Sequence, residues 1–132
     1  MAIHFQLRDG LVELTFQGKI IAADFQQVLE KLQELEARME VTPDRITDMS
    51  EGDLSALDSR VVTGIAAKRQ QAKLKNNVKS AILAPGLEQF GLARMFQTCN
   101  QNPAIAIRIF KDSASAYHWL GRPDRVVPEK SA

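Results

Sequence analysis

The residues with the clearest potential for chemistry form a short polar stretch in the middle of the chain, Asp58-Ser59-Arg60. Ser59 stands at or next to the predicted start of a helix, where unpaired backbone N–H groups and the positive end of the helix dipole favour an added anion. A phosphate on Ser59 would be repelled by Asp53 and Asp58 and attracted by Arg60. The stretch therefore indicates either a phosphorylation switch or an ordinary serine at a helix start.

Arg69 is a second candidate, because it lies in the middle of the apolar face predicted for the same helix. That face consists of Val61, Val62, Ile65, Ala66 and Ala72. A charged group on such a face either reaches past the end of a sheet into solvent along its alkyl stem, which we favour, or pairs with a buried acid or a bound anion. Arg69 is thus a candidate anchor for an anionic ligand.

The other chemically capable residues form no catalytic or metal-binding pattern. An acidic cluster precedes the helix: Asp48, Glu51, Asp53 and Asp58. It lacks the regular alternation and the closing glutamate of a calcium loop, so we interpret it as a solvated loop. His4 and His118 have no partner at metal-ligand spacing, and Cys99 has no nearby histidine to activate it. With no nucleotide-binding or hydrolase motif either, the sequence predicts no enzyme, no metal and no cofactor.

The charges are distributed unevenly along the chain. Residues 1–58 carry a balance of −7 and residues 59–132 a balance of +8, within a net charge of +1. The basic half indicates either a phosphate-binding surface or solvated helix positions. We favour the second interpretation, because the positive charges scatter around the predicted helix instead of forming one stripe. Nucleic-acid binding ranks last, since few aromatic residues are interleaved with these charges.

Alternating strands and helices would position these residues. The alternation of apolar and polar residues over 3–16, interrupted by Asp9-Gly10, predicts a β-hairpin with a type I′ turn. Apolar spacings of three and four after Asp24, the predicted N-cap, indicate a helix to about Met39. Further strands are predicted over 45–49, 78–84 and 105–109, and further helices over 58–75, 87–100 and 113–120. Either Ser55 or Asp58 would cap the second helix.

This order, β-β-α-β-α-β-α-β-α, predicts an α/β domain over residues 1–121 with a mixed, mostly parallel five-stranded sheet and about four helices. Residues 122–132 lack periodicity and are predicted to be disordered. No apolar run is long enough for a membrane span, and the N-terminus lacks a signal pattern. A single cysteine fits a reducing compartment, so we expect a cytoplasmic protein.

The central strand, loop and helix resemble the STAS domain, the fold of the anti-sigma factor antagonists. The matching residues are Asp48-Met49-Ser50 at the strand end and Asp58-Ser59 at the helix start. In that family the serine that opens the second helix is the phosphorylated switch. The resemblance implies that Ser59 is such a switch and that a kinase-type regulator is a partner.

The later half is similar to small bacterial single-domain SpoIIAA-like proteins, which are grouped with STAS and Sec14-type domains. The similarity rests on FGLARMFQ (90–97), IRIFKD (107–112) and AYHWLG (116–121). It implies the SpoIIAA-like (STAS) fold. The Sec14 side of the resemblance implies that a small-molecule carrier is an alternative function.

Two hypotheses follow. The first is a non-enzymatic regulatory module that contacts a protein partner through Asp53, Asp58, Arg60 and Val62, switched at Ser59. The alternative is a carrier or sensor of a small apolar or anionic ligand, held between the second and third helices with Arg69 or Arg94 as the anion anchor. Homodimer formation is left open by both.

Overall fold

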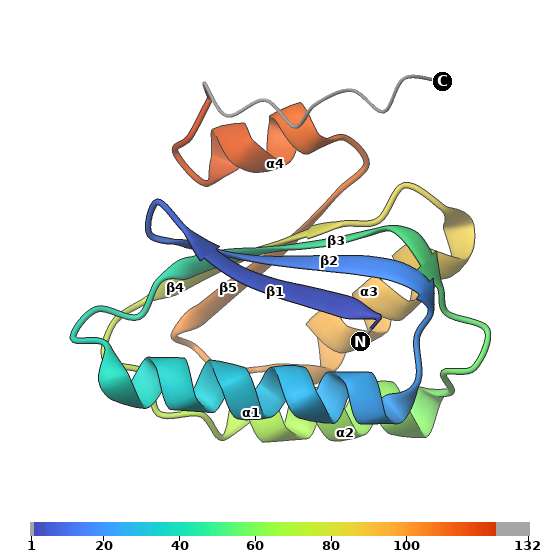
Figure 1. The fold of residues 1–132 in the computed structure, drawn as a ribbon, viewed down its shortest axis with the longest axis horizontal. Helices are drawn as coiled ribbons and strands as arrows, with labels where there is room; N and C mark the ends of the chain where they lie inside the picture. The colour runs from blue at the N-terminus through green and yellow to red at the C-terminus, as the bar shows by residue number, and fades with distance from the viewer. Residues whose placement is uncertain (1, 124–132) are drawn as a thin grey trace.

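After an initial pair of strands, helices and strands alternate along the rest of the described chain (Figure 1). The structure is a computed structural model, and it describes residues 2–123. The strands are β1 (Ile3–Arg8), β2 (Leu11–Lys19), β3 (Asp44–Asp53), β4 (Val78–Leu83) and β5 (Ile105–Phe110); the helices are α1 (Ala22–Arg38), α2 (Ser59–Gln70), α3 (Leu87–Cys99) and α4 (Ser113–Trp119). The predicted order of elements is confirmed.

The five strands form one sheet in the order β1-β2-β3-β4-β5. β1 pairs antiparallel with β2, and the other three pairs are parallel. The predicted hairpin turn is confirmed: Asp9 and Gly10 have φ values of 52° and 74°, as a type I′ turn requires. β3 lies at the centre of the sheet. Its residues 45–48 are therefore flanked by strands on both sides.

Helices cover both faces of the sheet, and Figure 1 shows α1 and α2 on one side and α4 on the other. Side chains of α1 and α3 join the same buried cluster, which includes Phe16, Leu32 and Ala93. A separate cluster lies under α4 and includes Tyr117. Successive residues of a strand point to opposite faces, so each central strand contributes to both clusters.

Several element boundaries differ from the prediction. Asp24 is not the N-cap of α1; it lies inside the helix, and its Oδ2 accepts a hydrogen bond from the backbone N–H of Ile21 at 2.9 Å. β3 extends to Asp53 because its later residues pair with the long β2. α2 ends at Gln70 instead of Lys75, and the side chain of Asn102 donates hydrogen bonds to the carbonyl oxygens of Arg69 and Ala72 at this end.

The described chain ends shortly after α4. Gly121 has a φ of 77°, as predicted for the residue that closes this helix. Arg122, which was predicted to begin a disordered tail, donates from Nη1 to the carbonyl oxygen of Asp9 at 2.7 Å. Residues 124–132, the rest of that predicted tail, lie outside the described residues. No helix in the described range has the length and apolar character needed to cross a membrane.

Candidate functional site

The loop before α2 presents most of the predicted partner-binding residues on the surface. Asp53, Asp58, Ser59 and Arg60 are all exposed. Asp58 is the N-cap, because its Oδ1 accepts the backbone N–H of Val61 at 3.1 Å. Ser59 is therefore the first residue of α2, and its hydroxyl lies where a partner or an enzyme can reach it.

Two carboxylates of β3, Asp53 and Asp48, accept hydrogen bonds from nearby serines. Hydrogen bonds from the side chain and backbone N–H of Ser55 lower the pKa of Asp53 below its ordinary value of 3.8, so this carboxyl is ionised at neutral pH. Ser50 donates to Asp48 through both its backbone N–H and its hydroxyl, at 2.9 and 2.6 Å. Within residues 2–123, no group of three or more acidic, histidine or cysteine side chains could hold a metal ion.

Val62 does not belong to this surface. It is 5% exposed and packs inside the domain, although we predicted that it contacts a partner. The reason is the helical periodicity: Val62, Ala66 and Arg69 follow one another at spacings of four and three and form the buried face of α2. A partner at the start of α2 would therefore meet Ser59 and Arg60 but not Val62.

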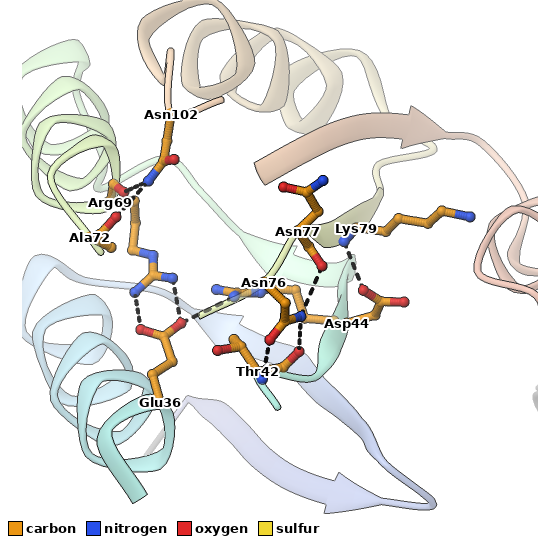
Figure 2. Close-up of polar contacts among 10 residues, drawn as sticks. Glu36, Thr42, Asp44, Arg69, Ala72, Asn76, Asn77, Lys79 and Asn102 are labelled. Carbon is orange, nitrogen blue, oxygen red and sulfur yellow. Dashed lines mark hydrogen bonds and ion pairs between the residues drawn. The ribbon is translucent and has the colours of Figure 1, made fainter. Parts of the chain in front are cut away.

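Arg69 is buried and paired with an acid, so the interpretation that it reaches solvent was wrong. The side chain is 4% exposed and forms a two-point ion pair with Glu36 of α1. Nη2 lies 2.6 Å from Oε2, and Nη1 lies 3.1 Å from Oε1 (Figure 2). Two parallel charge-assisted hydrogen bonds fix the orientation of both groups, so Arg69 joins α2 to α1.

Arg45 is a third member of this buried cluster, and we did not predict it. It is 5% exposed, and its Nη2 lies 3.1 Å from the Oε2 of Glu36 that Arg69 also contacts. A signal was present in the sequence: Arg45 is in phase with Met49, which points into the core, and Glu36 comes four residues after the buried Leu32. Charged residues at core-facing positions of two elements therefore indicate buried charge, although not which groups pair.

Glu36 and Arg45, two members of this cluster, have shifted pKa values. Burial raises the pKa of Glu36, but the hydrogen bonds and charges of Arg69 and Arg45 together outweigh it, so the pKa lies below 4.5. Burial, with repulsion from Arg69, lowers the pKa of Arg45 to about 10. Glu36 and Arg45 are therefore both charged at neutral pH.

A cavity of about 100 Å³ opens between the sheet and the helices α1, α2 and α3. Its walls are almost entirely apolar and include Phe16, Leu32, Val62 and Ile82. Its polar lining residues are Arg45, Thr47, Arg69, Ser80 and Asn100. An apolar chamber with a few polar groups is the usual form of a small-molecule site.

Two hydrogen-bond donors in this lining have no acceptor among the described residues: Nε of Arg45 and Nδ2 of Asn100. The orientation of the Asn100 amide is set by its Oδ1, which accepts the backbone N–H of Asn102 at 3.1 Å. Asn102 in turn donates to the carbonyl oxygens of Arg69 and Ala72, at 3.1 and 2.9 Å (Figure 2). The residues of the cavity wall thus include two donors that have no acceptor among the described residues.

Arg94, our other candidate anion anchor, is not in this cavity. It is exposed on α3, where its Nη1 donates to Oε1 of Gln97 at 2.9 Å. His4 is also exposed, and its Nε2 lies 2.9 Å from Oε1 of Gln17. Of the two arginines that we predicted as anchors, Arg69 alone is brought to the cavity.

Comparisons with known proteins address the fold. No protein-family model matches the chain, and no curated protein matches it. Among solved structures, the chain is similar to an uncharacterized protein of the DUF3478 family from Shewanella loihica PV-4, whose structure has a SpoIIAA-like fold. The two chains share 20% sequence identity with a TM-score of 0.59, over 90% of this chain and 92% of the other.

Proposed function

The SpoIIAA-like fold is the premise, and from it we propose that this chain is a non-enzymatic regulatory module of STAS type that carries or senses a small amphipathic ligand inside the domain. The supporting observation is the cavity of about 100 Å³, whose apolar wall contains the buried donors of Arg45 and Asn100. A buried donor without an acceptor costs about 1–3 kcal/mol, and a ligand that supplies the acceptor removes that cost. The cavity therefore favours a molecule with an apolar body and one accepting group.

The position of the cavity suggests how a bound ligand would affect the surface. Leu54 and Leu57, on the loop before α2, both line the cavity. Asp53, Asp58 and Ser59, on or next to the same loop, face solvent. A ligand would pack against the inner side of a loop whose outer side is available to a partner, so occupancy and partner binding would be coupled.

Native mass spectrometry of the protein purified from its own source tests this proposal. We expect a retained small molecule that is released on denaturation. Ile65→Phe, which adds an aromatic ring to the cavity lining from a half-buried position of α2, should lower the retained fraction. Ala67→Phe places the same ring on the exposed face of α2 and should leave that fraction unchanged. A protein that carries no small molecule would contradict the proposal.

The second candidate function is protein binding switched at Ser59, by a kinase-type regulator as the STAS resemblance implies. It is favoured by the exposure of Ser59 at the first position of α2, next to the N-cap Asp58. Affinity capture with Ser59→Asp and Ser59→Ala should recover different partners, whereas Ser55→Asp on the same loop should behave as wild type. If all three variants recover the same partners as wild type, Ser59 is not a switch.

A further inference from the structure

The buried cluster Arg45–Glu36–Arg69 carries more positive than negative charge. Both arginines contact the one carboxylate of Glu36, which leaves an excess of one positive charge. Asp44 attracts Arg45 more weakly than Glu36 does, and its Oδ1 is engaged with the backbone N–H of Lys79 at 2.8 Å. Among the residues that the structure describes, no second carboxylate forms an ion pair with either arginine. A buried charge of this kind is stabilised by a counter-charge.

The geometry of the donors indicates where that counter-charge would lie. Glu36 contacts Nη2 of Arg45, and Nε–H of the same guanidinium group has no acceptor among the described residues. Nδ2 of Asn100 carries two further N–H groups with no acceptor among the described residues. Both side chains, and Arg69, line the same apolar cavity. The polar part of the cavity therefore offers donors and positive charge together.

We propose that this cluster is the anion subsite of the cavity and that it binds the carboxylate of a short-chain, apolar monocarboxylic acid. The inference rests on the proposed ligand-binding function and specifies its ligand. A water molecule could accept from the same donors, but it would leave the excess positive charge unbalanced. A phosphate brings between one and two negative charges at neutral pH, more than the single excess charge of the cluster.

The apolar walls of the cavity determine the chemistry of the rest of the ligand. They are lined mainly by Leu32, Val62, Ile82 and similar side chains, which favour a hydrocarbon chain. The volume of about 100 Å³ is smaller than the roughly 150 Å³ of a cavity that takes up benzene. A short chain therefore fits the site, and one terminal carboxylate is enough to satisfy its charge.

A titration of the wild-type protein with propanoate and with its neutral analogues 1-propanol and propanamide tests the proposal. Binding is followed by ¹³C-methyl NMR of Val62 and Ile82, which locates the ligand. We expect propanoate to bind at least about tenfold more tightly than either analogue, because a charge-assisted hydrogen bond is roughly twice as strong as a neutral one. Equal affinities would overturn the anion subsite and leave the ligand-binding function standing. No binding of any of the three would overturn both.

Asn100→Asp provides a matched variant. The new carboxylate can keep the hydrogen bond from Asn102 N–H, but it replaces the donor Nδ2 with a negatively charged acceptor. Propanoate affinity should fall by at least about tenfold while 1-propanol affinity stays the same. Arg94→Met, which removes an exposed arginine of α3, is the control and should leave both affinities unchanged. Unchanged propanoate binding to a folded Asn100→Asp variant, checked by its thermal midpoint, would overturn the assignment.

Discussion

The two faces of the sheet differ in the side chains that cover them. The face under α4 is closed by apolar side chains of the strands and of the helix, Leu11, Ile46, Ala81, Ala116 and Leu120, together with Tyr117. The face under α1, α2 and α3 contains the larger apolar cluster, but also the ion pairs of Glu36 and the cavity. The α4 face is thus closed mainly by apolar side chains, and the opposite face combines a cavity with buried charge.

This difference separates stability from function. Replacing a buried ion-pair network with apolar residues of similar volume often leaves stability unchanged or improves it, so such a network is weak evidence for a role in stability alone. Buried charge beside a cavity is instead what binding an anion requires. Under the proposed function, the α4 face would serve packing alone, and the opposite face would combine packing with ligand binding.

The largest effect is expected for Glu36→Ala. It removes the shared carboxylate and leaves Arg45 and Arg69 buried without their counter-charge, which should destabilise the domain by about 3–5 kcal/mol. Urea unfolding followed by circular dichroism measures this. The matched control is the triple change Arg45→Met, Glu36→Leu and Arg69→Met, which should recover most of that stability. If Glu36→Ala lowers the free energy of unfolding by no more than a substitution at an exposed position does, Glu36 does not stabilise the cluster.

Leu120→Ala should have the next largest effect, on the other face. Leu120 is buried under α4, so truncation leaves a cavity in an otherwise closed cluster and should cost about 2–4 kcal/mol. The same urea measurement applies. The affinity for propanoate should be unaffected, because Leu120 is not in the cavity lining. A change in propanoate affinity in this variant would contradict the division between the two faces.

The acid dependence of stability should depend on Glu36. Its pKa in the folded protein lies below its ordinary value of 4.5. Its contribution to the free energy of unfolding is therefore fully present above pH 4.5 and is lost as the pH falls through the folded pKa. Glu36→Gln should therefore be less stable than wild type at pH 7, and the difference should narrow toward pH 3. Urea midpoints measured across this range test the sign. Glu30→Gln, on the exposed face of α1, should show a small difference that does not vary in this way.

Asp58→Ala should have the smallest effect. It removes the cap of α2 and exposes the N–H of Val61, which should lower stability by about 1 kcal/mol. Asp58→Asn, which keeps an accepting oxygen, should lose less. A shift in the urea midpoint is again the measurement. Equal losses in the two variants would show that the carboxylate charge, and not the cap hydrogen bond, stabilises this end of the helix.

Much of the fold could be predicted because its signals are local. Asp9-Gly10 specifies a hairpin turn without help from the rest of the chain, and the apolar spacing in α1 identifies a helix. The exposure of Ser59 followed from its place at a helix start. The contacts at the end of α2 could not be predicted, because they come from Asn102, which is distant in the sequence. Leu87, an apolar residue at the start of α3, is 92% exposed.

The sequence by itself determined the order of the elements, the mostly parallel sheet and the presence of a charged residue, Arg69, on the buried side of α2. Tertiary structure alone decided what that charge does. Glu36 and Arg69 are 33 residues apart, and their pairing with Arg45 requires α1, α2 and β3 to meet around one cavity. Periodicity reports which side of an element is buried, but it contains no information on which buried groups meet, because that depends on how the elements pack.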